Sequence, residues 1–156
     1  MFNASPTSEH LLDDVPGSIK LLIEAISDRK VQQLCLNSNA IGAQGVQSFD
    51  QFLTNSTHLQ ILNLSNCKLD AEAMNTISDA LQYSEFTQIK EFYLSINTMG
   101  SEGAKALAKY FISYDKLTFL EIEGCRIQED GMNELLQSLV PSANQGSLIH
   151  LDVSDN

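Results

Sequence analysis

One short stretch decides the fold: Leu34-x-Leu36-x-x-Asn39-x-Ile41-Gly42, in which x is any residue. Its apolar-x-apolar start indicates a strand, and the Asn that follows precedes an apolar residue and a helical segment. The same order recurs along the rest of the chain. The further copies are Leu62-x-Leu64-x-x-Cys67-x-Leu69-Asp70, Phe92-x-Leu94-x-x-Asn97-x-Met99-Gly100, Leu120-x-Ile122-x-x-Cys125-x-Ile127-Gln128 and Leu151-x-Val153-x-x-Asn156.

The period of the repeat identifies its kind. The steps between the Asn or Cys positions 39, 67, 97, 125 and 156 are 28, 30, 28 and 31 residues. This is the long end of the leucine-rich repeat, whose usual length of about 20–29 residues leaves room for a full helix in each unit. We therefore expect an α/β leucine-rich-repeat solenoid of the ribonuclease-inhibitor-like kind. It should have about four and a half repeats, with parallel strands on the concave side and helices on the convex side.

The segments between the strands carry apolar residues at helical spacing. Each segment should therefore form a helix that packs one apolar stripe against the sheet. A further helix is expected near the start, where the acidic pair Asp13-Asp14 precedes Val15-Pro16. The stripes are Ile19, Leu22, Ile23 and Ile26; Val46, Phe49, Phe52 and Leu53; Met74, Ile77, Ala80 and Leu81; Leu107, Ala108, Phe111 and Ile112; and Met132, Leu135, Leu136 and Leu139.

The length predicts one domain over residues 1–156. No helix follows the last strand, and a solenoid needs polar caps, so we expect a fragment of a longer solenoid. Its uncapped ends would favour non-native self-association. The expected parts are a loose lead-in at 1–10, the helix of an incomplete first repeat at 11–30, repeats at 31–58, 59–88, 89–116 and 117–147, and a truncated last repeat at 148–156.

The Asn and Cys positions predict a structural ladder, because their side chains can satisfy backbone groups that a turn leaves unpaired. Cys67 and Cys125 belong to this ladder, and Cys35 lies in a strand. The sequence lacks the closely spaced cysteine pairs of a metal site. Three cysteines, an odd count, and the lack of a signal peptide favour a reducing, cytoplasmic location.

The amino-acid composition limits the classes of partner that the chain is expected to bind. The net charge of −11 fits either a solvated acidic surface or one that meets a basic protein. No Lys/Arg stripe indicates nucleic-acid binding, and no apolar run approaches the roughly 20 residues of a membrane span. His10, His58 and His150 have no nucleophile or ligand placed beside them, so we expect no metal and no cofactor. Glu121 and Glu123 lie on a strand and at its edge, where they either face a partner or are solvated.

Two stretches resemble a known family. Residues Asn39 to Phe49, reading NAIGAQGVQSF, and Leu62 to Cys67, reading LNLSNC, are similar to the leucine-rich domain of RanGAP, the activating protein of the nuclear-transport GTPase Ran. The resemblance extends from about Asp14 to the end of the chain. The repeat pattern itself is shared with ribonuclease-inhibitor-like proteins generally.

The resemblance implies that the chain is not itself an enzyme but activates a Ran-type GTPase without an arginine finger. Hydrolysis needs a water that is oriented by the GTPase's own glutamine. In the family, the asparagine just before the ladder position helps to orient that glutamine, and here this residue is Asn66. An amide can donate and accept together. The alternative is an ordinary polar turn residue. The available binding edge is Asn37, Ser38, Asn66, Lys68, Ser95, Glu123, Arg126 and Asp155.

Departures from the family pattern count against this activity. Ser8-Glu9-His10 stands where the family has Thr-Gly-Arg, and Thr98 stands where a family arginine can follow the ladder asparagine. The acidic tail and several repeats are also missing. The alternative function is a non-catalytic interaction scaffold, like ribonuclease-inhibitor-type or immune-receptor repeats.

Overall fold

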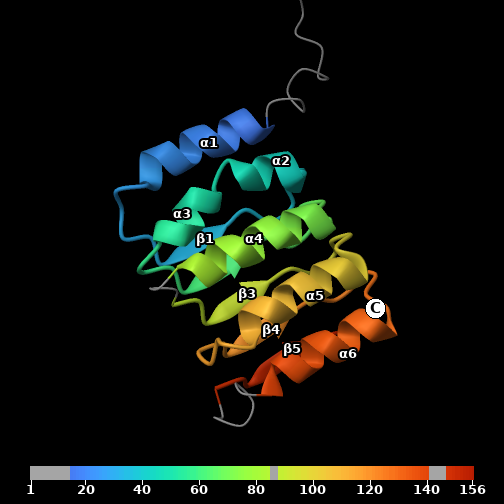
Figure 1. Ribbon diagram of the computed structural model, residues 1–156. Coiled ribbons are helices and arrows are strands. Elements are labelled where there is room, and N and C mark those ends of the chain that lie inside the picture. Colours follow the sequence, from blue (N-terminus) through green and yellow to red (C-terminus); the bar gives the residue numbers. More distant parts are fainter. Residues whose placement is uncertain (1–14, 85–87, 141–146) are drawn as a thin grey trace, which may run out of the picture.

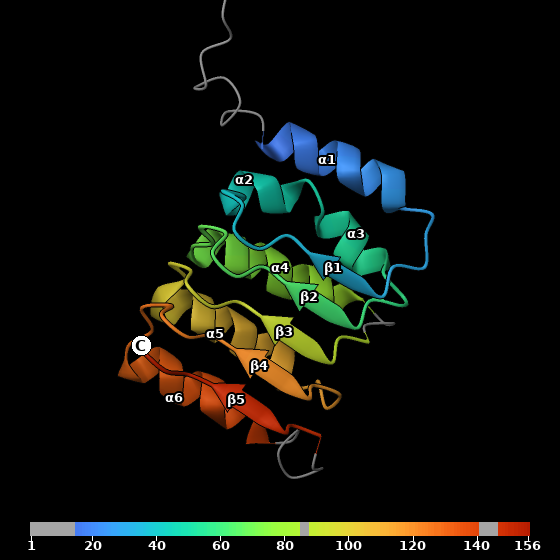
Figure 2. The same ribbon diagram turned by 180° about the vertical axis from the view of Figure 1, so that it is seen from behind.

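The computed structural model describes residues 15–84, 88–140 and 147–156. In this part of the chain the strands follow one another in order, and each pairs in parallel with the next (Figure 1, Figure 2). The expected lead-in at 1–10 and the acidic pair at 13–14 lie outside the described residues. The strands are β1 (Gln33–Cys35), β2 (Ile61–Asn63), β3 (Glu91–Tyr93), β4 (Phe119–Glu121) and β5 (His150–Asp152).

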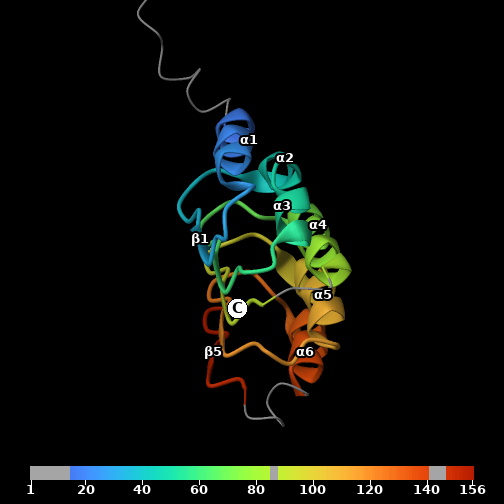
Figure 3. The same cartoon turned by 90° about the vertical axis from the view of Figure 1, so that its left-hand side faces the viewer.

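The helices form a second layer. Viewed from the side, they stack along one face of the molecule while the strands line the other (Figure 3). This arrangement confirms the predicted leucine-rich-repeat solenoid, with the sheet on its concave side. The helices are α1 (Val15–Ile26), α2 (Gly42–Gln47), α3 (Asp50–Asn55), α4 (Ala71–Tyr83), α5 (Gly100–Phe111) and α6 (Glu129–Ser138).

The central residue of each strand faces the helices. Leu34, Leu62, Phe92 and Leu120 lie side by side in this row and are at most 5% exposed. Because successive strand residues point to opposite faces, the residues on either side of this row point to the concave surface. These outward residues are Gln33 and Cys35, Ile61 and Asn63, Glu91 and Tyr93, Phe119 and Glu121, and His150 and Asp152.

The predicted ladder is present after the strands. The Asn97 side chain is 2% exposed. Its Oδ1 accepts hydrogen bonds from the backbone N–H groups of Cys67 and Leu69, both at 3.0 Å. Its Nδ2 donates to the carbonyls of Leu64 and Leu94. Asn97 therefore satisfies backbone groups in its own turn and in the preceding one, and Asn156 does the same for the turn of Cys125.

Cysteine alternates with asparagine in the ladder. The Cys67 thiol donates to the carbonyl of Leu36 at 3.1 Å, and the Cys125 thiol donates to that of Leu94 at 3.2 Å. Both residues are completely buried. Their structural role is therefore clear, and burial raises the pKa of each thiol, that of Cys125 to about 11.

The helix expected across residues 46–53 is interrupted. It forms as α2 and α3, and the break falls at Ser48 and Phe49. Phe49 has φ −134°, outside the helical range, and its ring is fully buried. The ring therefore reaches the core from a break in the helix and not from a continuous helical face.

Some residues of the predicted apolar stripes are exposed. Leu22 of α1 is 40% exposed and Leu136 of α6 is 37% exposed. Among the described residues, α1 packs mainly against α2 and α6 mainly against α5, so each is covered on one flank only. Ile112 is 67% exposed because it caps the C-terminus of α5, beyond the packed turns.

Candidate functional site

The turns that follow the strands share an unusual backbone conformation. The residue just before each ladder position has φ between +53° and +63°, in the left-handed region. This residue is Ser38, Asn66, Ile96, Gly124 or Asp155, depending on the repeat. The first four turns contain a second left-handed residue. It lies three residues after Asn39 and Asn97, as Gly42 and Gly100, but directly after the two cysteines, as Lys68 and Arg126. We refer to these turns, residues 37–42, 65–70, 95–100, 123–128 and 154–156, as the turn edge.

Asn66 lies exposed on the turn edge. Its backbone N–H donates to the carbonyl of Ser95 at 2.8 Å, and its side-chain Nδ2 makes a long contact of 3.4 Å with Ser38 Oγ. Asparagine tolerates a positive φ better than most residues do. The turn therefore gives Asn66 a structural reason to be there, and its carboxamide remains open to a partner.

Most of the other predicted edge residues are accessible. Asn37, Ser38, Lys68, Arg126 and Asp155 are exposed, and Glu123 is half-buried. Their backbones run side by side, since the Ser38 N–H donates to Ser65 O at 2.9 Å and the Ile96 N–H donates to Glu123 O at 2.8 Å.

The placement of Ser95 on this binding edge was wrong. Its side chain is only 7% exposed. The turns on both sides are hydrogen-bonded to its own turn, Asn66 to Ser95 O and Ile96 to Glu123 O. A short hydroxymethyl group between two flanking turns does not reach the surface.

A row of aromatic side chains lies on the concave face, and the sequence analysis missed it. The Phe119 ring stacks on the His150 imidazole, with centroids 4.0 Å apart and planes 5° apart. On its other side the Tyr93 ring lies at 4.9 Å with a 36° tilt. Tyr93 and Phe119 are half-buried and His150 is exposed. The available signal was their position beside the buried central residue of each strand, where side chains point away from the helices.

Carboxylates flank the aromatic row. The Tyr93 hydroxyl donates to Glu91 Oε2 at 2.8 Å, and His150 Nε2 lies 3.9 Å from Glu121 Oε1. The pKa of Tyr93 is raised to about 12, chiefly by burial and then by its hydrogen bond to Glu91 and the negative charges of Glu91 and Glu121. Ser154 lowers the pKa of Asp152 by donating hydrogen bonds from its backbone and hydroxyl. This half of the concave face therefore carries negative charge.

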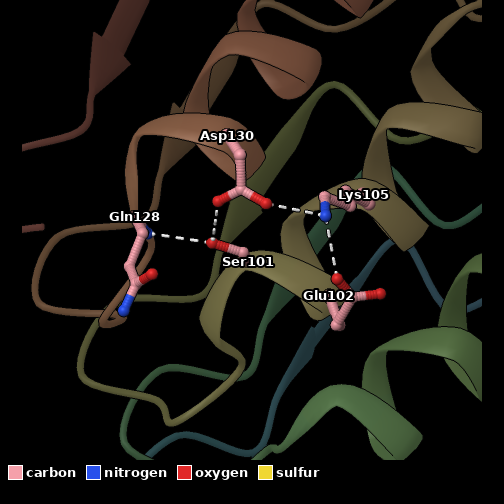
Figure 4. Close-up of polar contacts among 5 residues, drawn as sticks. All are labelled: Ser101, Glu102, Lys105, Gln128 and Asp130. Atoms are coloured by element: carbon pink, nitrogen blue, oxygen red, sulfur yellow. Dashed lines mark hydrogen bonds and ion pairs between the residues drawn. The ribbon is translucent and has the colours of Figure 1, made fainter.

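Another polar cluster joins the helices α5 and α6 near their N-termini (Figure 4). The Ser101 hydroxyl donates to Asp130 Oδ1 at 2.8 Å and accepts from the Gln128 N–H at 3.1 Å. Lys105 Nζ bridges Asp130 at 2.7 Å and Glu102 at 2.8 Å. These bonds hold the pKa of Asp130 at about 2. Ser101 and Lys105 are thus engaged in fastening two repeats together and do not form a nucleophile–base pair.

A cleft lies between α1 and α3. It has a volume of about 550 Å³, and its walls include Ile23, Arg29, Phe52 and His58. Within the described residues, no group of His, Cys, Asp and Glu side chains could hold a metal ion. Over the same residues, no helix combines the length and the apolar character that crossing a membrane requires.

Comparison with known proteins agrees with this geometry. A family model described as Leucine Rich repeat matches residues 55–79 and 88–108. The described residues have the leucine-rich-repeat solenoid fold. Outside these matched segments, the same strand, turn and helix recur at 31–55 and 119–138.

Two mammalian proteins are among the curated proteins that the chain resembles. The chain is 28% identical over 136 residues to NACHT, LRR and PYD domains-containing protein 5 of Mus musculus, a match that covers 85% of this chain and 12% of that protein. It is 27% identical over 128 residues to ribonuclease inhibitor of Sus scrofa, covering 81% and 27% respectively. The chain therefore spans only a small part of either relative.

Solved structures share the solenoid fold at low sequence identity. Leiomodin-1 Actin-Binding Site 2 superposes with a TM-score of 0.68 at 18% identity, covering 95% of this chain and 80% of that one. The tropomodulin C-terminal domain of Caenorhabditis elegans gives a TM-score of 0.64 at 11% identity, covering 92% and 82%.

Proposed function

We propose that this leucine-rich-repeat chain is a non-catalytic scaffold that binds a protein partner on the concave face of its sheet and the adjoining turn edge. The observation that carries the proposal is the aromatic row of Tyr93, Phe119 and His150. It stands on a sheet face that none of the described helices covers. Aromatic side chains in such positions are enriched in the energetically dominant part of protein interfaces.

Two further observations support a binding role. The polar cluster of Ser101 and Lys105 is occupied by contacts between repeats. The relative named ribonuclease inhibitor acts, by its name, on another protein. A solenoid offers a long, preformed surface, and binding there costs little reorganisation.

The test is an affinity capture in which the immobilised chain is the bait. Phe119→Ala removes the centre of the aromatic row, and Tyr83→Ala is the matched control, since Tyr83 is 79% exposed on the helical layer. We expect specific partners to be retained by the wild type and by Tyr83→Ala but lost by a folded Phe119→Ala. Equal retention by both variants would contradict binding through the concave face.

A second candidate function is activation of a Ran-type GTPase. It is favoured by the exposed carboxamide of Asn66 on the turn edge, at the position that the RanGAP resemblance assigns to orienting the partner's glutamine. Such an activator would contribute positioning and no covalent chemistry.

Single-turnover GTP hydrolysis by Ran, with and without the chain, separates the two functions. Asn66→Gly is the informative variant because glycine keeps the positive φ of the turn and removes only the amide. The control is Asn75→Ala, on the exposed side of α4. The GTPase role would be supported by an activation that is lost with Asn66→Gly and kept with Asn75→Ala. An unchanged hydrolysis rate with the wild-type chain would exclude it.

A further inference from the structure

Ile96 adopts a backbone conformation that disfavours its own side chain. Its φ is +59°, a value that places a β-branched side chain in steric conflict with the backbone. The equivalent turns use Ser38, Asn66, Gly124 and Asp155, none of which is β-branched. Strain of this kind persists where the surrounding fold imposes it, and it is concentrated at functional surfaces.

Burial does not compensate for this strain. The Ile96 side chain is 62% exposed, so most of its apolar surface remains in water. Its backbone N–H donates to the carbonyl of Glu123, and it follows Tyr93 by three residues in the same repeat. Ile96 therefore stands on the turn edge at the rim of the aromatic row.

The outward positions of β3, β4 and β5 carry three carboxylates and one histidine, His150. Glu91, Glu121 and Asp152 occupy outward positions of β3, β4 and β5, and Glu123 follows β4. In the described strands no Lys or Arg occupies an outward position; the nearby Arg126 belongs to the turn edge. The outward residues of β1 and β2, in contrast, are uncharged: Gln33, Cys35, Ile61 and Asn63.

We infer that the surface formed by Tyr93, Ile96, Phe119, Glu121 and Glu123 binds a protein segment that presents an apolar side chain next to an arginine or lysine. The apolar group would cover Ile96, which removes exposed apolar surface from water. The cation would meet the carboxylates of Glu121 and Glu123; in the described strands the basic side chain beside Glu121 is His150, and no Lys or Arg holds an outward position there. This inference rests on the proposed scaffold function and specifies the chemistry of the partner.

Fluorescence anisotropy with synthetic peptides tests this chemistry. The probe is a fluorescein-labelled peptide in which leucine and arginine alternate. A second peptide replaces each arginine with citrulline, which keeps the shape and removes the charge, and a third replaces each leucine with serine. We expect the dissociation constant to rise by about tenfold for each replacement, since neither contact alone suffices.

Variants of the chain locate the binding. Ile96→Asn removes the apolar group but keeps a residue that tolerates the positive φ, and Ile112→Asn is its matched control because Ile112 is 67% exposed at the end of α5. Glu121→Gln removes one carboxylate, and Glu134→Gln does the same on α6. We expect both rim variants to weaken binding about tenfold and both controls to leave it unchanged.

Several results would overturn the inference. They are equal binding of the arginine and citrulline peptides, equal binding by Ile96→Asn and the wild type, and no binding of any peptide. If affinity capture still yields partners that Phe119→Ala loses, the scaffold function stands and only the assigned partner chemistry fails. If capture shows no dependence on Phe119, the scaffold function fails as well.

Discussion

The carboxamide of Asn97 fastens the turn of Cys67 to the next repeat, since Asn97 Oδ1 accepts a hydrogen bond from the Cys67 N–H at 3.0 Å. The same oxygen accepts from the Leu69 N–H at 3.0 Å, and the amide nitrogen donates to carbonyls in both repeats. A single buried side chain thereby completes the backbone hydrogen bonding of two turns, in a place where water cannot replace it.

Asn97→Ala should therefore destabilise the protein. The substitution leaves buried N–H and C=O groups without hydrogen-bond partners, and each such group costs about 1–3 kcal/mol. We therefore expect the free energy of unfolding to fall by about 3 kcal/mol in total. Asn39→Ala is the control, because Asn39 is exposed and, among the described residues, its side chain bonds only to Leu36 O and Asn37 O in its own turn. The control should lose less than about 1 kcal/mol. Urea denaturation measures both values, and equal losses would contradict the ladder's role.

Ile96→Asn should stabilise the isolated protein. It relieves the cost of a β-branched residue at φ +59° and gives up little buried apolar surface, so the free energy of unfolding should rise by about 1 kcal/mol. Ile112→Asn, at φ −55°, should give no such gain. A lower urea midpoint for Ile96→Asn than for the wild type would show that Ile96 is not strained.

Gly131→Ala should loosen the contact between α5 and α6. A Cβ atom at position 131 would lie 2.6 Å from Ser101 Cα and 2.9 Å from Ser101 O, both backbone atoms that cannot move independently. We expect a loss of about 3 kcal/mol, together with weakening of the bond between Ser101 and Asp130. At Gly124 (φ +63°) a Cβ would meet open space, so Gly124→Ala should lose only about 1 kcal/mol through backbone strain. Thermal denaturation of the two variants tests this order.

The three cysteines should differ in reactivity. Cys35 is exposed, whereas Cys67 and Cys125 are buried and burial raises the pKa of both thiols. Because the thiolate is the reactive form, a thiol reagent at pH 8 should modify Cys35 rapidly and the other two only after unfolding. Mass spectrometry of labelled peptides identifies the modified residue. Rapid labelling of Cys67 in the folded protein would show that its turn opens.

The raised pKa of the Cys125 thiol predicts that the protein loses stability in alkaline solution. The Cys125 pKa is raised from 9.0 to about 11 in the folded state, so above pH 9 the unfolded chain releases its proton first. The folded state then binds more protons than the unfolded state, and stability must fall as pH rises from 9 to 11. The free energy of unfolding, measured by urea denaturation, should fall less across this range for Cys125→Ala than for the wild type. Each protein is compared with its own stability at pH 8.

The repeat in the sequence determined the order of the strands, the parallel sheet and the ladder. Each copy carries its own apolar positions and its own Asn or Cys, so Leu62 and Cys67 indicate a buried strand and a turn without knowledge of any neighbour. The exposed location of Asn66 followed from the same pattern. The break between α2 and α3 did not, because Phe49 lies at helical spacing whether or not the helix is continuous.

Only the tertiary structure decided which variable residues form a surface. Phe119 and His150 are 31 residues apart, and neither belongs to the apolar pattern that repeats. The register of β4 with β5 places them opposite each other, which brings the rings to 4.0 Å. Ser95 and Ile96 likewise follow one another in sequence, yet the turn buries the first and exposes the second. Local periodicity fixes which side chains face the helices, whereas contacts between repeats depend on strand register and turn conformation, which packing of the whole solenoid sets.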